Sequence, residues 1–342
     1  MRIVIMGTGP FAVPTAQQLL EAGHDIPLVV TRPLVDPQAK KIPPRPIYDW
    51  AIEQGLTVFE PASINDELAI GRLRSTGADL LFVCDYGQIL SRDCLSVTPL
   101  GGINLHGSLL PRHRGAAPVQ WALLRGDASA GVTVIHMTPR LDAGPALSIA
   151  STDIMADETA QELEPRLAAL GVAATEQAVE MLKTWDGNSQ LGIIQDKSLV
   201  TKAPRFSKSD GQLDFRLPAD YLARLVRACQ PWPGTFAELR WPEGKQMRMM
   251  VRSARVWSTV TTALSDLTAG SVVALNTAEL GVDWPAPWKR VLAVSSGGGL
   301  FLAGRIQPAG KREMDVDELL RGHPLSGVGS FLLPPEPLIA LA

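Results

Sequence analysis

Asn104 and His106 stand two residues apart at the end of an apolar run, a spacing that turns two side chains to the same face of a β-strand. We therefore expect both polar groups to face one pocket. A side-chain amide can donate a hydrogen bond to a developing oxyanion, and an imidazole can hold or move a proton near neutral pH. Together these residue types indicate a reaction in which a carbonyl carbon becomes tetrahedral.

Asp142 is the candidate for a third reacting group, in a loop predicted over residues 138–145. A carboxylate can fix the tautomer of an imidazole and help to carry protons away. The alternative is that an amide and an imidazole at a strand end make only structural hydrogen bonds. A single motif does not separate these two interpretations.

The segment after His106, residues 107–111, is too apolar for an ordinary surface loop. It ends in Pro111, which cannot continue a strand ladder. We expect this segment to form a wall of the same site.

The elements that must position these groups alternate between strand and helix. An apolar run at residues 1–6 leads through a glycine-rich turn into a helical pattern that ends before Gly23. Further strands are predicted over residues 26–30, 57–59 and 80–84, with helices over residues 48–54 and 66–74. This alternation predicts an α/β fold with a doubly wound, mostly parallel sheet. The turn at residues 85–89 then lies at the carboxyl end of a strand, where such sheets bind ligands.

The sequence after residue 118 predicts the remaining elements and the division into domains. A helix over residues 119–125, a strand over 131–137 and one long amphipathic helix over 159–185 complete the first part. Because a domain has roughly 150 residues, a chain of 342 residues favours two domains. We place the first at residues 1–189, a linker at 190–208, the second at 209–331 and a poorly ordered tail at 332–342. Short strands separated by glycines predict a small OB-like β-barrel for the second domain.

Charge is distributed unevenly along the chain, whose formal net charge is −3. Residues 197–255 hold 12 basic and 5 acidic side chains, a local net charge of +7. A basic patch of this kind is the expected footprint of a nucleic-acid partner. A solvated surface with no such partner is the alternative interpretation.

Cysteine and histidine spacing excludes some classes of protein. The three cysteines are widely spaced and form no CxxC pair, and the first residues do not read as a secretory signal, so we expect a reduced, cytoplasmic protein. No apolar run reaches the roughly 20 residues that span a bilayer. The five histidines show no ligand spacing such as HExxH, and we expect no metal.

Three runs of sequence resemble the 10-formyltetrahydrofolate-dependent formyltransferases. These runs are MRIVIMGTGPFAVPT at the start, NLHGSLLPRHRGAAPVQWA in the middle and LDAGP after it. The resemblance covers nearly the whole chain and is greatest to the branch that formylates methionyl-initiator tRNA. It implies a Rossmann-like catalytic domain, an OB-like tRNA-binding domain, 10-formyltetrahydrofolate as cosubstrate, and a monomer. An apparent insertion lies around Trp284 and Trp288, for which packing against apolar neighbours is the simpler prediction and stacking on bases the alternative.

The resemblance also implies roles for individual residues. The family's catalytic asparagine, histidine and aspartate fall on Asn104, His106 and Asp142. The positions expected to contact folate fall on Ser108, Leu109, Leu110, Pro111, Tyr86, Gly87 and Ile89. Asp85 stands where the family has a small residue, so we expect the contacts to the pterin ring to differ there.

Two basic segments are expected to contact tRNA. One is the proline-rich stretch at residues 31–48, and the other is the lysine-rich entry to the second domain at residues 201–215. The side chains expected to meet phosphate groups are Arg32, Lys40, Lys41, Arg45, Lys202, Arg205 and Lys208. The first segment departs from the family in its run VDPQAKK.

Three alternative functions remain open at this point. Gly7, Gly9 and Ala12 satisfy the GxGxxG/A fingerprint, which is typical of an NADP-dependent oxidoreductase but does not explain Asn104 and His106. A formyltransferase acting on an amino sugar nucleotide would share the N-x-H motif, and the basic second half argues against it. A non-catalytic tRNA-binding protein would show salt-sensitive binding without product.

Overall fold

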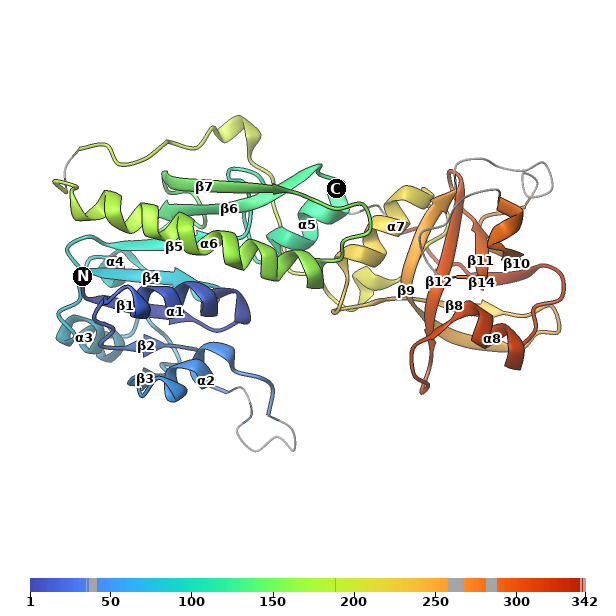
Figure 1. The fold of residues 1–342 in the computed structure, drawn as a ribbon, viewed down its shortest axis with the longest axis horizontal. Helices are drawn as coiled ribbons and strands as arrows, with labels where there is room; N and C mark the ends of the chain where they lie inside the picture. The colour runs from blue at the N-terminus through green and yellow to red at the C-terminus, as the bar shows by residue number, and fades with distance from the viewer. Residues whose placement is uncertain are drawn as a thin grey trace. The chain divides into compact units, whose positions relative to one another are not determined.

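The computed structural model describes residues 1–342 except 35, 37–41, 188, 258–266, 281–287, 339 and 341–342. The chain divides into two compact units. The first comprises residues 1–122, 128–154 and 162–205, and the second comprises residues 123–127, 155–161 and 206–342. Figure 1 labels the helices and strands of both.

A seven-stranded sheet in the order β3-β2-β1-β4-β5-β6-β7 forms the centre of the first unit. The strands are β1 Ile3–Gly7, β2 Val29–Val30, β3 Val58–Phe59, β4 Leu80–Cys84, β5 Gly102–His106, β6 Ser129–His136 and β7 Ala146–Asp153. The first five in chain order pair in parallel, whereas β6 pairs antiparallel with β5 and with β7. The predicted α/β fold with a mostly parallel sheet is confirmed.

Helices connect and cover these strands. They are α1 Val13–Glu21, α2 Pro46–Glu53, α3 Glu67–Ser75, α4 Arg92–Leu95, α5 Pro118–Arg125 and α6 Ala160–Lys183, with 3-10 turns η1 Pro10–Ala12 and η2 Lys197–Leu199. The long helix predicted over residues 159–185 is therefore confirmed as α6. A methyl group on Gly171 would lie 2.6 Å from the side chain of Leu105, so α6 packs closely on β5 at this glycine.

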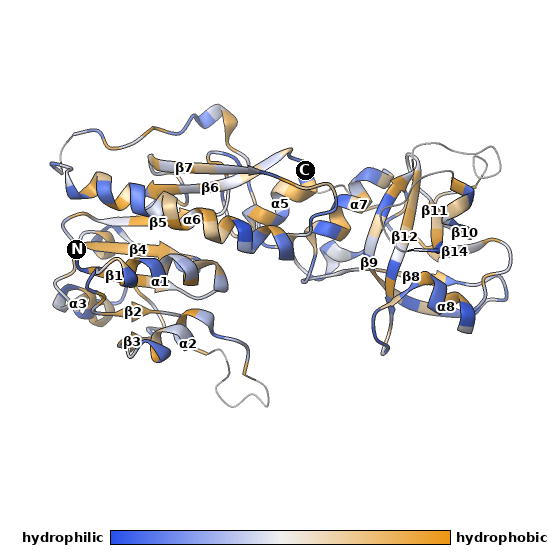
Figure 2. Cartoon of the chain, viewed as in Figure 1, coloured by the Kyte–Doolittle hydropathy of each residue, from blue (hydrophilic) through white to orange (hydrophobic). Residues whose placement is uncertain are grey.

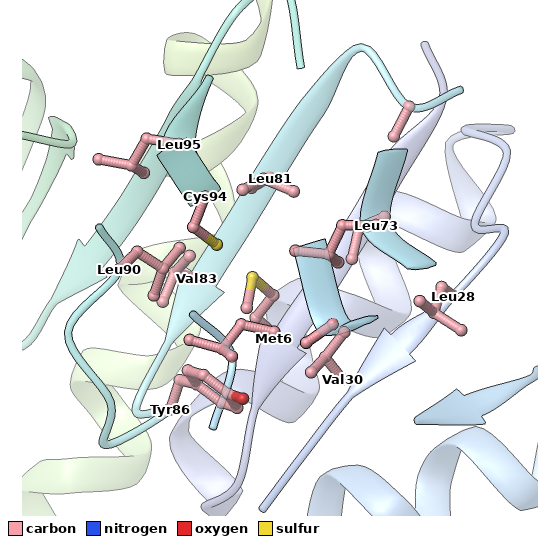
Figure 3. Packing of buried hydrophobic residues seen from close by; sticks show 14 residues of the cluster. Met6, Leu28, Val30, Leu73, Leu81, Val83, Tyr86, Leu90, Cys94 and Leu95 are labelled. Atoms are coloured by element: carbon pink, nitrogen blue, oxygen red, sulfur yellow. The ribbon is translucent and has the colours of Figure 1, made fainter. Parts of the chain in front are cut away.

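A buried apolar cluster on one face of the sheet fixes the ends of β1, β2 and β4. Figure 3 shows Met6, Val30 and Val83 from these strands packed with Leu73 of α3 and Cys94 of α4. All five residues of β4 are buried, and this strand is coloured as apolar in Figure 2. Burying this surface holds the strands in place, so the loops that leave their carboxyl ends start from fixed points.

The second unit is an antiparallel barrel. Its sheet runs β11-β10-β14-β8-β9-β12-β13, and an additional β11–β12 pairing closes six of these strands into a ring. The elements are β8 Thr235–Arg240, β9 Gln246–Trp257, β10 Ser271–Asn276, β11 Arg290–Ser295, β12 Leu300–Pro308, β13 Met314–Asp315, β14 Gly329–Leu332, α7 Ala219–Ala228, α8 Val316–Gly322, η3 Ser209–Gly211 and η4 Thr277–Leu280. The predicted barrel is confirmed.

The core of the second unit includes an aromatic cluster and one of the two insertion tryptophans. Phe215 stacks on Phe331 and meets Phe301 edge to face. Trp288 is buried with Val291 and Leu302, which confirms the apolar packing predicted for it. Trp284 lies outside the described residues.

The tail predicted to be poorly ordered is instead held by side chains of the second unit. The Arg216 guanidinium donates hydrogen bonds to the carbonyl oxygens of Pro334 and Glu336, each at 3.0 Å. The backbone N–H of Leu338 donates to Asp214 Oδ2 at 2.8 Å. The prediction was wrong for these residues because the proline content gave no sign of the polar partners that they meet more than a hundred positions earlier in the chain.

Candidate functional site

A cavity of about 460 Å³ opens at the carboxyl ends of β4 and β5 in the first unit. Seven residues named from the sequence line it, namely Asn104, His106, Asp142, Tyr86, Gly87, Ile89 and Arg205. All of the lining residues belong to the first unit. Strand β5 places Asn104 and His106 on the same face, as the two-residue spacing predicted.

His106 is oriented by a backbone carbonyl group. Its Nε2 lies 2.9 Å from the carbonyl oxygen of His113. Because a carbonyl oxygen can only accept, Nε2 carries the hydrogen, and the lone pair of a neutral imidazole lies on Nδ1. Nδ1 faces Asp142 Oδ2 at 3.8 Å, which is too long for a direct hydrogen bond but close enough for the carboxylate to stabilise an imidazolium.

The carboxylate of Asp142 is buried and only partly hydrogen-bonded. The backbone N–H of Gly115 donates to its Oδ2 at 2.9 Å. Within the described part of the chain, this is the only hydrogen bond that the Asp142 carboxylate accepts. Asp142 lines the cavity and its Oδ2 lies beside His106, so a substrate group or a proton can reach the carboxylate.

The Asn104 side chain lines the cavity and is half-buried. Among the residues that the structure describes, it has no hydrogen-bond partner, whereas its backbone is fixed in the sheet opposite Val83 of β4 and Ile135 of β6. An amide held by its strand with unused donors can bind an oxyanion without first breaking another contact.

Left-handed backbone conformations surround the cavity. In the described residues, positive φ at a non-glycine residue occurs at Asp85 (55°), His113 (60°) and Asp142 (48°). Asp85 and Asp142 line the cavity, and His113 supplies the carbonyl group that meets His106. Such conformations cost roughly 1–3 kcal/mol each and persist only where neighbouring contacts hold them. This clustering of backbone strain distinguishes the cavity from the rest of the described chain.

Two further carboxylates line the cavity beside the predicted site residues. The Asp85 side chain is accessible from the cavity, and protein groups surround it on its other sides. Glu164 lines the cavity from α6. Reduced hydration raises the pKa of Asp85, with Arg205 and His106 acting in the opposite direction. Burial, and then the charge of Asp85, raises the pKa of Glu164. The cavity therefore holds three carboxylates, those of Asp85, Asp142 and Glu164, together with the guanidinium groups of Arg140 and Arg205.

The Ser108–Pro111 segment lies behind the site. All four residues are described, and none of them lines this cavity. Thr133 Oγ1 donates to the carbonyl oxygen of Ser108 at 2.7 Å and accepts from the N–H of Leu110 at 3.1 Å. The predicted contact of this segment with folate stays a prediction, whereas its hydrogen bonds show how β6 holds it.

The predicted tRNA contacts fall in different surroundings. Arg32 lies beside Gly87, whose added Cβ would be 3.3 Å from its guanidinium. Arg45 is engaged by Glu60 and lies over the ring of Tyr48 at 3.6 Å. The side chains of Lys202 and Lys208 are exposed and make no ion pair with another described residue, and Lys40 and Lys41 lie outside the described residues.

Sequence reasoning missed three residues that shape this site. His113 orients His106 through a backbone atom, for which side-chain type gives no signal. Glu164 lies next to the apolar stripe of α6 that begins at Leu163. A charged residue at the edge of that stripe was the one feature of the sequence that could have pointed to it. Gln195 contacts both the Asp142 loop and Arg114 across more than fifty residues of sequence.

Two properties of the described chain bear on the class of protein. No group of three or more histidine, cysteine, aspartate or glutamate side chains in the described ranges is placed to hold a metal ion. No described helix combines the length and apolar character needed to cross a membrane.

Two family models match this chain. Residues 1–179 match the model described as "Formyl transferase", and residues 205–324 match the model described as "Formyl transferase, C-terminal domain". Together they cover most of both units, including β5 and the loop that carries Asp142.

Curated relatives match over nearly the full length. A protein named methionyl-tRNA formyltransferase from Rhodopirellula baltica is 45% identical, over 98% of this chain and 97% of its own. One of the same name from Methylococcus capsulatus is 40% identical, over 96% of this chain and 98% of its own. Among solved structures, HypX from Aquifex aeolicus in complex with tetrahydrofolic acid has a TM-score of 0.57 at 13% identity, covering 94% of this chain and 47% of that one. At that identity the structural likeness concerns the fold.

Proposed function

Because this chain belongs to the formyl transferase family, we propose that it transfers the formyl group of 10-formyltetrahydrofolate to the α-amino group of methionyl-initiator tRNA. The observation that carries this proposal is the meeting of Asn104, His106 and Asp142 in one cavity. The names of the relatives, which share both halves of this chain, support methionyl-tRNA as the formyl acceptor.

The reaction begins with attack of a neutral amine on the formyl carbon. An α-amino group titrates at pH ~8, so about a fifth of it is already neutral near pH 7.4 without strong activation. The attack turns the formyl oxygen into an oxyanion, and the free amide of Asn104 donates a hydrogen bond to it. The collapse of this intermediate breaks the bond between the formyl carbon and N10 of the folate.

Protons move through His106 and Asp142. The amine nitrogen loses a proton as the new C–N bond forms, and His106 returns that proton to N10 as N10 leaves. The Nδ1 lone pair of His106 accepts the proton from the amine, and Asp142 at 3.8 Å stabilises the imidazolium that results. The carbonyl group of His113 keeps the ring in this orientation through Nε2. No covalent intermediate with the enzyme is required.

The folate cosubstrate binds in the same cavity. Tyr86, Gly87 and Ile89 form the wall that follows β4, and Ile89 is 60% exposed, which leaves its apolar surface free to cover a flat ring. The relation to HypX with tetrahydrofolic acid agrees with a folate ligand at the level of the fold.

The domain assignment follows from this function. We assign catalysis to residues 1–189 and tRNA binding to residues 209–331, with residues 190–208 between them, in a cytoplasmic monomer. Lys202 and Lys208 are exposed cations in the segment at this junction. Exchanging both for glutamine should weaken tRNA binding and flatten the dependence of log K on log salt by about 1 to 2. An unchanged slope would remove these lysines from the tRNA interface. Arg205 is left in place in this test because it lines the cavity.

The test of the function uses the purified protein, 10-formyltetrahydrofolate and charged initiator tRNA. Formylmethionine is detected by mass after deacylation. We expect product from the wild type and from the control His24→Ala, whose histidine does not line the cavity, and little from His106→Ala. If the wild type gives no product with intact substrates, amino sugar nucleotides are the next acceptors to supply, and product from them would replace the tRNA assignment.

A further inference from the structure

We propose that Gln195 is a positioning residue that fixes the Asp142 loop and the segment around Arg114 in the geometry needed for formyl transfer. Gln195 belongs to the stretch predicted as a linker, yet the structure places it within the first unit. The kinetic part of this inference rests on the proposed function.

Gln195 is 92% buried from solvent, with an exposed fraction of 8%, and every polar atom of its side chain is used. Its Nε2 donates to the carbonyl oxygens of Asp142 at 2.9 Å and Gly144 at 2.7 Å. Its Oε1 accepts hydrogen bonds from Arg114 Nε at 3.1 Å and from Arg114 Nη2 at 2.6 Å. The amide orientation is settled by its partners, because carbonyl groups only accept and a guanidinium only donates.

The Asp142 loop needs an external contact to keep its shape. The backbone of Asp142 is left-handed, and Gly144 passes so close to His136 that an added Cβ would lie 1.8 Å from the carbonyl oxygen of that residue. Because Gln195 binds the carbonyl groups on either side of Ala143, it holds both ends of this tight turn. Without it, the left-handed residue loses contacts that offset its conformational cost.

The segment around Arg114 carries the other half of the site. His113 presents its carbonyl oxygen to His106, and the N–H of Gly115 donates to the carboxylate of Asp142. Arg114 lies between them and is bound through its side chain to Gln195. A displacement of this segment would therefore move the groups that orient both His106 and Asp142.

Backbone pairing of the predicted linker supports the same role. Arg114 N–H donates to the carbonyl oxygen of Thr201 at 2.9 Å, and Ala203 N–H donates to that of Arg114 at 2.7 Å. Ile193 and Ala146 exchange two hydrogen bonds of 2.8 Å. The stretch on either side of Gln195 is thus paired to both catalytic segments, and Gln195 joins them to each other.

Substitutions at position 195 separate the two halves of this contact. Gln195→Leu removes the donor and the acceptor, whereas Gln195→Glu keeps an acceptor for Arg114 but turns a carboxylate toward two carbonyl groups. We expect both variants to lower kcat by about 100-fold, because a displacement near 1 Å has that effect, with KM for both substrates within about twofold. Gln190→Leu, an exposed position of the same stretch, is the matched control and should match the wild type.

A second measurement distinguishes positioning from general destabilisation. In an Asp142→Asn background, Gln195→Leu should lower kcat by less than about tenfold more, because most of its action passes through Asp142 and the His106 imidazolium that Asp142 stabilises. Multiplication of the two separate losses, or a kcat of Gln195→Leu within about threefold of the wild type, would overturn the proposal. Thermal unfolding checks that each variant is folded at the assay temperature.

Hydrogen exchange tests the inference without any substrate. The N–H of Gly115 is held by Asp142, and that of Ala143 by the carbonyl oxygen of Arg140. Both amides should exchange at least about tenfold faster in Gln195→Leu than in Gln190→Leu. Unchanged exchange would contradict the positioning role. An inactive wild type with faster exchange in Gln195→Leu would instead reject the proposed function and retain the positioning.

Discussion

Two buried aspartates, one in each unit, have opposite surroundings. Asp214 in the second unit has no exposed side-chain surface, and its carboxylate accepts hydrogen bonds from the Arg216 guanidinium and from the backbone N–H groups of Arg216 and Leu338. Asp142 in the first unit is 9% exposed and accepts one hydrogen bond from the described residues, given by Gly115. Among the described residues, His106 Nδ1 at 3.8 Å is the only basic side-chain nitrogen within 4 Å of this carboxylate.

The difference shows what each carboxylate contributes. Asp214 is saturated with donors and joins a turn, an arginine and the tail, so its role is to stabilise the second unit. Asp142 lines the cavity and stands on a strained backbone, so it stabilises the fold little. Incomplete pairing leaves a charge available for a proton or a substrate.

Replacing Asp142 should have the largest effect. Asp142→Asn keeps the size of the side chain but removes the charge that stabilises a protonated His106. We expect kcat to fall about 100- to 10,000-fold. The assay is formyl transfer under saturating substrates, and a loss below about tenfold would remove Asp142 from the proton path.

Asn104→Ala should cause the second largest fall in kcat. Removing a donor that binds an oxyanion typically lowers the rate about 100- to 1,000-fold. Because the side chain of Asn104 has no hydrogen-bond partner in the described structure, its loss should leave Tm within about 2 °C of the wild type. Near-normal turnover by a folded Asn104→Ala variant would exclude the assigned role.

Asp214→Asn should change stability and leave chemistry intact. Breaking one partner of a buried ion pair costs about 3 kcal/mol, so urea should unfold this variant at a lower concentration. The kcat of the folded fraction should equal that of the wild type. A large fall in kcat with unchanged stability would show that Asp214 acts in the chemistry and not in stabilising the second unit.

The effect of Asp214 should depend on pH in a defined direction. Burial acts to raise the pKa of Asp214, but hydrogen bonds from Arg216 and Leu338 outweigh it and lower the pKa overall. A lowered folded-state pKa means that the stabilisation is present above the unfolded pKa and is lost as pH falls through the folded value. The stability gap between wild type and Asp214→Asn should therefore be full at pH 7 and shrink in acid.

The smallest effect is expected at Asp85. Its pKa is raised by reduced hydration, so its contribution to stability is fully present below the unfolded pKa and is lost as pH rises through the folded value. Asp85→Asn should be slightly more stable than the wild type at pH 8, by less than about 1 kcal/mol because water in the cavity screens the charge. The gain should disappear near pH 3, and thermal unfolding at both values checks it.

Local patterns predicted the regular elements well. The apolar run at residues 80–84 became β4 with the same bounds, and the spacing from Leu163 predicted α6 to within two residues at either end. Both signals depend on periodic burial, which a single sequence displays directly. The shared face of Asn104 and His106 followed from the same geometry.

Long-range polar contacts could not be predicted in this way. The hydrogen bond from Gln195 to Asp142 joins residues 53 positions apart, and the one from Leu338 to Asp214 joins residues 124 positions apart. No periodic pattern of the sequence connects either pair. His113 acts through a backbone oxygen, which every residue type carries. These contacts fix the geometry of the site, and only a three-dimensional structure reveals them.

The most direct test is the single-turnover rate of formyl transfer to methionyl-initiator tRNA by Asp142→Asn and Asp214→Asn side by side. Both variants are measured at neutral pH and at a temperature where both are folded. We predict a rate at least about 100-fold below the wild type for Asp142→Asn and an unchanged rate for Asp214→Asn. Equal rates for the two variants would contradict the claim that the incompletely paired carboxylate performs the chemistry.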